Sequence, residues 1–183
     1  MYEVEVKAKL NNRQLVQDKL ISMGCTFSEE LHQIDSIFIP EDLPFPPPFG
    51  TPVLRVRNQN GQSIFNLKIN QSSRQDCIEQ ELEISDGDTM LNIIKLLKYK
   101  PVPTVDKKRI KTNYGGIEVV LDTVENLGEF IEAEKVLTEN NPLERKKIQE
   151  ELFTFLLTLG VQEEDRVIDG KYDIMLYEKF GMK

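Results

Sequence analysis

Apolar and polar residues alternate strictly at the start of the chain, from Tyr2 to Leu10. The even positions are apolar, and Glu3, Glu5, Lys7 and Lys9 stand between them. Successive side chains of a β-strand point to opposite faces, so this pattern predicts a strand with one apolar face and one charged face.

The same alternation recurs along the rest of the chain. We expect further strands at Gln33–Pro40, Val53–Asn58, Ser63–Asn70, Ile78–Ile84, Thr104–Tyr114, Ile117–Asp122 and Glu129–Val136. The turn sequences Asn60-Gly61 and Gly115-Gly116 favour tight hairpins between consecutive strands. About eight strands, mostly linked by hairpins, favour an antiparallel sheet that closes into a barrel.

Helical patterns separate some of these strands. We expect helices from Asn11 or Asn12 to Gly24, from Asp88 to Tyr99 and from Asn141-Pro142 to Gly160, with a short helix after Asp169. Each long helix begins at a side chain that can cap it and ends near a glycine or a proline. The predicted fold is therefore α+β, a closed eight-stranded antiparallel barrel with helices packed outside it.

The segment Glu41–Pro52 breaks the pattern with five prolines and Gly50. Proline cannot donate to a sheet ladder, so this segment is not an interior strand. We expect a stiff surface loop, with a lid over one mouth of the barrel as the alternative.

Composition narrows the class of protein. A chain of 183 residues without an interdomain linker is consistent with one domain over residues 1–183. The net charge of −8 argues against nucleic-acid binding by the whole surface. The chain has no apolar run long enough to span a membrane, and its first residues carry charges where a signal peptide is apolar, so a cytoplasmic location is expected.

Cysteine and histidine add little chemistry to this picture. Cys25 and Cys77 have no metal or redox spacing, and we expect one buried and one partly exposed reduced thiol, in that order. His32 is the only histidine, and it has no Asp or Ser partner at a recognisable spacing. A loop or edge position is expected for it.

The polar faces of the predicted strands are charged and sorted by sign. The acidic sets are Glu3 with Glu5, Glu79 with Glu81 and Glu83, and Asp122 with Glu132 and Glu134; the basic sets are Lys7, Arg55 with Arg57, Lys68, and Lys107 with Arg109. Residues two apart on a strand point the same way. Two arginines on one face repel unless an anion lies between them, and two parallel carboxylates favour a cation.

Two interpretations of these charges remain open. On an open, solvated sheet they would form weak ion pairs of under about 1 kcal/mol each. If the sheet closes with its apolar faces outward under the helices, every charged face points inward. Such an interior matches a polyphosphate held by Lys and Arg, with Mg²⁺ or Mn²⁺ held by the carboxylates. We therefore predict a polyphosphate tunnel.

Eight short motifs occur in a fixed order over nearly the whole chain. They are Glu3-Val4-Glu5-Val6-Lys7, Gln33-Ile34-Asp35, Leu54-Arg55-Val56-Arg57, Phe65-Asn66-Leu67-Lys68, Glu81 with Glu83, Lys107-Lys108-Arg109, Leu121-Asp122 and Leu127-Gly128-Glu129-Phe130-Ile131-Glu132-Ala133-Glu134. Together they resemble the CYTH superfamily, which comprises class IV adenylyl cyclases, thiamine triphosphatases and triphosphate tunnel metalloenzymes. Ile37 departs from the pattern, because many members have Tyr there.

The resemblance implies roles for the charged residues. It implies metal binding by Glu3, Glu5, Glu81, Asp122, Glu132 and Glu134, and phosphate binding by Lys7, Arg55, Arg57, Lys68, Lys107 and Arg109. Lys7 and Arg109 are the candidate catalytic groups. Lys7 would assist the nucleophile, because a lysine among other cations has a lowered pKa. The alternative for Lys7 is a phosphate clamp.

The compact length and the motif from Leu121 to Glu134 look most like the class IV adenylyl cyclase branch. That branch converts ATP to cyclic AMP and pyrophosphate and suggests a homodimer. One alternative is a metal-dependent triphosphatase acting on inorganic or thiamine triphosphate, and another is a polyphosphate- or nucleotide-binding module without catalysis. A further alternative, an interaction module for a basic peptide or another subunit, predicts an aliphatic barrel interior.

Overall fold

The computed structural model describes residues 2–139, 141–168 and 170–181. In chain order its elements are β1 (Tyr2–Lys9), α1 (Arg13–Ser22), β2 (Leu31–Pro40), β3 (Pro52–Gln59), β4 (Gln62–Ser73), β5 (Asp76–Ile84), α2 (Gly87–Leu96), β6 (Tyr99–Pro101), β7 (Val105–Tyr114), β8 (Ile117–Val124), β9 (Gly128–Leu137), α3 (Pro142–Thr158), the 3₁₀ turn η1 (Glu163–Asp165), β10 (Arg166–Val167) and α4 (Tyr172–Phe180).

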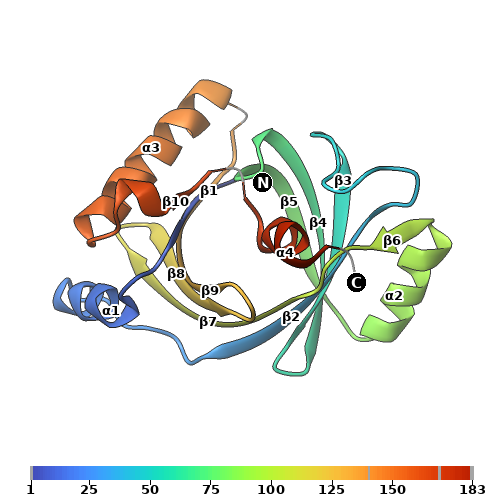
Figure 1. The fold of residues 1–183 in the computed structure, drawn as a ribbon, viewed down its shortest axis with the longest axis horizontal. Helices are drawn as coiled ribbons and strands as arrows, with labels where there is room; N and C mark the ends of the chain where they lie inside the picture. The colour runs from blue at the N-terminus through green and yellow to red at the C-terminus, as the bar shows by residue number, and fades with distance from the viewer. Residues whose placement is uncertain (1, 140, 169, 182–183) are drawn as a thin grey trace.

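Within these residues, eight strands hydrogen-bond in a closed antiparallel ring. The order is β1-β5-β4-β3-β2-β7-β8-β9, and β9 pairs back with β1 (Figure 1). The short strands β6 and β10 attach to β2 and β1 outside the ring. The predicted eight-stranded barrel is confirmed, because closure satisfies the edges that alternating strands would otherwise expose.

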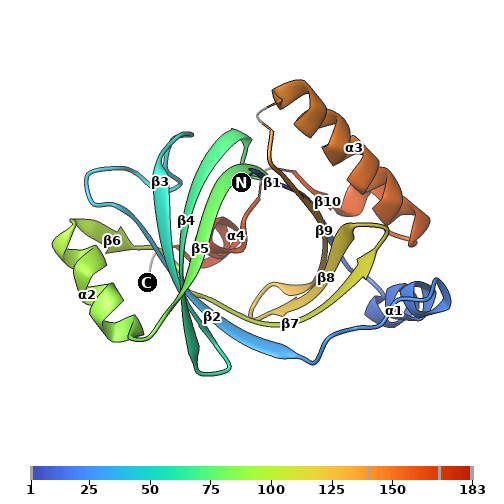
Figure 2. The same cartoon turned by 180° about the vertical axis from the view of Figure 1, so that it is seen from behind.

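The apolar faces of the strands point outward and are covered by helices, as predicted. On one side, Val6, Leu121 and Ile131 of the barrel pack with Leu20 of α1 and Leu156 of α3, and all five are fully buried. Figures 1 and 2 show α1 and α3 outside this side of the ring and α2 outside the opposite side. Truncation of a buried leucine in such a layer costs about 2–5 kcal/mol.

The α2 helix begins and ends earlier than predicted. Asp86, and not Asp88, is the N-cap, because its backbone is extended and its carboxylate accepts from the Thr89 N–H. The helix stops at Leu96, and Lys98 adopts a left-handed φ of 65°. Tyr99, predicted to be helical, belongs to β6 and pairs with Pro40 of β2.

The first turn of α3 contains one buried charged residue. Asn141 caps the helix as predicted. Arg145 is buried, and its Nε lies 2.7 Å from Asp76 Oδ1 at the start of β5. The helix is therefore joined to the barrel by an ion pair that its exposed neighbours Lys146 and Lys147 do not make.

The α4 helix supplies the short C-terminal helix that we predicted, although Asp169, where we expected it to begin, lies outside the described residues. In both views it lies within the outline of the barrel (Figures 1 and 2). Its Tyr172 and Leu176 form a buried apolar cluster with Val105, Val124 and Phe130. The interior of the barrel therefore also holds apolar side chains in this part, beside the charged ones that we predicted.

None of the helices in the described ranges is both long enough and apolar enough to cross a membrane.

Candidate functional site

The barrel encloses a cavity of about 500 Å³, a size typical of small-molecule sites. Among the described residues, nine lysines and arginines line it together with eight aspartates and glutamates. They are Lys7, Arg55, Arg57, Lys68, Arg74, Lys107, Arg109, Lys111 and Lys171, with Glu3, Glu5, Asp35, Glu79, Glu81, Glu132, Glu134 and Asp173. An aliphatic interior, which the interaction-module alternative predicts, is contradicted by this lining.

Three predicted metal ligands meet on one side of the cavity. Glu3 and Glu5 of β1 and Glu134 of β9 each place a carboxylate oxygen within 4.8 Å of the others. Burial raises the pKa of Glu134, and the charges of Glu3 and Glu5 raise it further, to about 9. Clustered oxygen ligands that repel one another in this way fit Mg²⁺ or Mn²⁺.

Glu132 lies next along the inner face of β9 but is held by cations. Lys7 Nζ lies 3.1 Å from Glu132 Oε1, and Arg109 Nη2 lies 2.7 Å from Oε2. Burial raises the pKa of Glu132, but Lys7 and Arg109 outweigh it, so the pKa is well below its usual value. Its role as a metal ligand stays a prediction that requires these cations to move.

Asp122 is fully buried and does not line the cavity. Arg109 binds it through both Nε, at 2.7 Å, and Nη2, at 2.5 Å, and Lys107 lies 3.3 Å away. The structure thus places Asp122 behind Arg109, where it fixes the guanidinium. Its predicted metal role remains untested.

Asp35 lies in the site, although we assigned it no role from the sequence. Arg57 Nε and Nη2 bind its two oxygens at 2.6 and 2.9 Å, and Arg55 Nη1 lies 3.7 Å away. Burial raises the pKa of Asp35, but Arg55 and Arg57 more than reverse this effect and leave it well below its usual value. The sequence did contain a signal for this role, because Asp35 lies two residues after Gln33 and therefore on the same face of the strand.

Lys68 bridges two carboxylates from different strands. Its Nζ lies 2.7 Å from Glu3 Oε1 and 2.7 Å from Glu79 Oε2. Arg55 Nη2 also lies 3.5 Å from Glu79 Oε1. The Glu79 side chain is 13% exposed, against 46% for the predicted ligand Glu81. Burial raises the pKa of Glu79, but Lys68 outweighs burial and the pKa falls to about 2. Glu79 is the second carboxylate of the cavity to which we assigned no role from the sequence.

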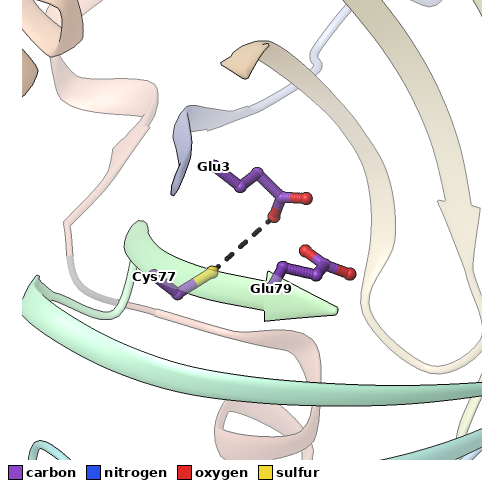
Figure 3. Close-up of side chains that lie close together, drawn as sticks. All are labelled: Glu3, Cys77 and Glu79. Atoms are coloured by element: carbon purple, nitrogen blue, oxygen red, sulfur yellow. Dashed lines mark hydrogen bonds between the residues drawn. The ribbon is translucent and has the colours of Figure 1, made fainter. Parts of the chain in front are cut away.

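Cys77 lies beside this bridge. Its Sγ–H points to Glu3 Oε1 at 3.9 Å, and Glu79 lies on the same strand (Figure 3). The side chain is buried, which corrects the partly exposed position that we expected. Burial raises the pKa of the thiol to about 11, so the sulfur remains protonated and is a poor nucleophile.

The two central lysines differ in a way that reverses the expectation for Lys7. Burial lowers the pKa of Lys7, but Glu132 and Glu5 outweigh burial and raise it above its usual value. Burial also lowers the pKa of Lys107, Arg109 lowers it further, and the result is about 8. The lysine with a lowered pKa is therefore Lys107.

Two remaining positions lie away from the cavity. Glu83 follows Glu81 on β5 but is exposed and does not line it. His32 Nε2 lies 2.8 Å from Asp106 Oδ1, so His32 has the aspartate partner that its sequence spacing did not reveal. The side chains of His32 and Asp106 are substantially exposed. His32 nevertheless lies within β2 and pairs with Lys108 of β7, so the expected loop or edge position is wrong.

Comparisons with known proteins agree with this geometry. The family model described as "CYTH domain" matches residues 1–170. A Methanocaldococcus jannaschii protein named "Putative adenylate cyclase" is 31% identical and the match covers 94% of this chain and 97% of that one. A solved Pyrococcus horikoshii OT3 protein is 27% identical, with 97% and 99% of the chains covered and a TM-score of 0.80.

A more distant solved structure from Hippeastrum is 17% identical, has a TM-score of 0.58 and covers 100% of this chain and 98% of that one. That protein is described as a "Putative adenylyl cyclase" with a dominant triphosphatase activity, and at this identity the likeness concerns the fold alone. The match of the family model over most of the chain and the curated relative above carry the assignment. The chain belongs to the CYTH domain family.

Proposed function

We propose that the protein is an adenylyl cyclase that binds ATP with Mg²⁺ or Mn²⁺ inside the barrel and converts it to cyclic AMP and pyrophosphate. The observation that carries this proposal is a single cavity in which the carboxylates of Glu3, Glu5 and Glu134 lie among buried lysines and arginines. Carboxylate oxygens suit hard divalent cations, and clustered cationic side chains suit a triphosphate.

The metal would be held by Glu3, Glu5 and Glu134. Burial and the neighbouring charges of Glu3 and Glu5 keep the pKa of Glu134 high, and a divalent cation would offset the repulsion among these carboxylates. Lys68 donates to Glu3, so a cation on Glu3 would release the ammonium for a phosphate oxygen. When bound, the ion supplies charge neutralisation and orientation of the triphosphate.

The phosphates would be held by Arg55, Arg57, Lys107 and Arg109. Two of these guanidiniums are already oriented, Arg57 by Asp35 and Arg109 by Asp122, so little side-chain entropy is lost when phosphate binds. A bound triphosphate would add negative charge beside Lys107 and raise its pKa again. Lys107 therefore suits a phosphate ligand better than a proton acceptor.

In the proposed reaction the ribose 3′ oxygen attacks the α-phosphorus, and a new O3′–P bond forms. The bond from the α-phosphorus to the bridging oxygen breaks, pyrophosphate leaves, and the hydroxyl proton passes to solvent. Burial lowers the pKa of Lys7 and of Arg109, but nearby carboxylates outweigh burial. The main carboxylate is Glu132 for Lys7, and Asp122 together with Glu132 for Arg109, so both side chains stay protonated at neutral pH. Fixed cations at this point stabilise the charge that develops on the leaving group.

The cavity also offers a wall for an organic group. Ile37 and Ile39 of β2 and Val53 of β3 line it, and Ile37 is the cross-strand partner of Arg55. A ligand whose phosphates reach Arg55 would thus place its next atoms against apolar side chains. This supports a nucleoside triphosphate over bare tripolyphosphate, in line with the name of the Methanocaldococcus relative.

Product analysis tests the proposal. The purified protein is incubated with ATP, thiamine triphosphate or tripolyphosphate, each with Mg²⁺ or Mn²⁺. We expect cyclic AMP and pyrophosphate from ATP, with loss of both in Glu5→Gln and retention in Glu83→Gln, whose side chain lies outside the cavity. Orthophosphate from the other two substrates without any cyclic AMP would overturn the cyclase assignment.

A triphosphatase is the second candidate. The same cations and carboxylates would serve water attack on the γ-phosphorus, and the Hippeastrum protein of this fold is described as having a dominant triphosphatase activity. This candidate predicts orthophosphate as the first product. A rise in melting temperature with each triphosphate but no turnover of any would instead indicate a binding module.

A further inference from the structure

The proline-rich segment contributes an aromatic ring to the cavity. Phe45 and Pro47 of the loop between β2 and β3 line it together with Ile37, Ile39 and Val53. The segment was expected to be a surface loop, and half of its residues are exposed, but Pro47 is buried and Phe45 is partly buried. Two of its side chains therefore line the same cavity as Arg55 and Ile37.

A second element holds this ring. The Phe45 ring meets the ring of Tyr177 on α4 edge to face, with centroids 5.1 Å apart and an interplanar angle of 85°. Tyr172 and Ile174 of the same helix also line the cavity. An edge-to-face contact leaves one face of an aromatic ring available for stacking and restrains its orientation.

We propose that Phe45 stacks on the planar base of a nucleoside triphosphate and that Tyr177 is the residue that positions it. This inference rests on the proposed triphosphate site and names the part of the protein that would recognise the organic group. The geometry carries it in two ways. Ile37, the cross-strand partner of Arg55, lines the same cavity as Phe45. Phe45 is an aromatic side chain of that cavity, and Tyr177 of α4 restrains its ring.

Strand β2 itself offers no aromatic ring to the ligand, because the described residues of this strand that line the cavity are Asp35, Ile37 and Ile39. Phe45 lines the same cavity from the loop that follows β2. Because stacking on an aromatic ring tolerates different bases, the loop would favour a planar ring without by itself selecting adenine.

Binding of two hydrolysis-resistant probes tests the inference. One is adenosine 5′-(α,β-methylene)triphosphate, and the other is bis(methylene)triphosphonate, which has the phosphate chain but no ring. With Mg²⁺ present, Kd values are measured by isothermal titration calorimetry. Phe45→Ala should weaken the nucleotide roughly tenfold and leave the triphosphonate within about twofold, because a stacked base contributes on that order.

Matched variants separate stacking from loop structure. Phe45→Trp and Tyr177→Phe should retain nucleotide affinity, whereas Tyr177→Ala should lose part of it without affecting the triphosphonate. Phe49→Ala is the control, because Phe49 is an exposed aromatic residue of the same loop that does not line the cavity. Circular dichroism confirms that each variant is folded.

The outcomes are distinct. Equal weakening of both probes by Phe45→Ala, or no weakening of either, overturns the stacking role while leaving the triphosphate site standing. If the unaltered protein binds neither probe, the proposed function fails and this inference fails with it.

Discussion

Glu5 on β1 and Glu134 on β9 are direct cross-strand partners, and both side chains face the cavity. Like charges in this arrangement destabilise a sheet, and Glu3 adds a third carboxylate within 4.8 Å. The folded protein limits the cost by keeping a proton on Glu134, whose pKa is raised to about 9 by burial and by its two neighbours. A divalent cation would replace that proton.

Replacement of Glu134 by Gln should therefore stabilise the protein without metal. The folded-state pKa of Glu134 lies above its usual value of 4.5, so the wild-type protein loses stability as the pH rises from about 4.5 to about 9. Glu134→Gln removes that loss and should raise the melting temperature near pH 8 by roughly 2–4 °C, the shift that 1 kcal/mol gives in a chain of this size. It should also abolish stabilisation by Mn²⁺. The control is Glu83→Gln, and a lower melting temperature for Glu134→Gln than for that control would contradict the assignment.

Metal affinity should rise with pH. Below a pKa of about 9 the proton on Glu134 must leave before the cation binds, so each pH unit should strengthen Mn²⁺ binding by up to about tenfold until that pKa is reached. Calorimetric titrations at several pH values, in buffers with different ionisation enthalpies, measure both the affinity and the protons released. Binding that is independent of pH and releases no proton would show that Glu134 is not a ligand.

Removal of Arg57 should affect stability as well as turnover. Arg57 makes two hydrogen bonds to the buried Asp35, so Arg57→Ala leaves that carboxylate short of a partner and should cost about 3–5 kcal/mol. The loss of turnover is informative only in a folded protein. In the double variant Arg57→Met with Asp35→Asn, urea denaturation should show most of the stability restored while activity stays absent. Normal turnover by that folded double variant would exclude Arg57 as a phosphate ligand.

Arg145 should be a determinant of stability outside the cavity. Its guanidinium lies 2.7 Å from Asp76 and 4.7 Å from the Tyr2 ring, so it joins α3 to both β1 and β5. Arg145→Ala should lower the free energy of unfolding by about 3–5 kcal/mol, because it leaves a buried carboxylate without this partner. Lys146→Ala, one exposed position further along the helix, should change it by less than about 0.5 kcal/mol. Similar values for the two variants in urea titrations would disprove the structural role.

Sequence and structure agree most closely where a local pattern decides the outcome. Alternation over Tyr2–Lys9 was enough to predict which side chains of β1 face inward, since the side-chain period of a strand is a local property. Capping of α3 by Asn141 was predictable for the same reason. The α2 boundary was wrong because Asp86 and Asp88 are both able to cap, and the backbone conformation chose Asp86.

Partners from strands that are not joined by a tight turn were not predictable from a local pattern. Asp35 meets Arg57 across the long proline-rich loop, and Lys7 meets Glu132 where the ring closes. The Arg109–Asp122 pair, in contrast, follows from the hairpin turn at Gly115-Gly116. The pKa values of Lys7 and Lys107 move in opposite directions because each depends on carboxylates and cations from other strands. Phe45 and Tyr177 meet across more than a hundred residues of chain.

The sequence by itself determined that each strand has one apolar and one charged face, because alternation is a local property of a strand. Only the tertiary structure decided which carboxylates cluster, which cations are neutralised, and where α4 and the proline-rich loop add apolar side chains. Those outcomes depend on long-range contacts and on burial, and both exist only once the ring has closed.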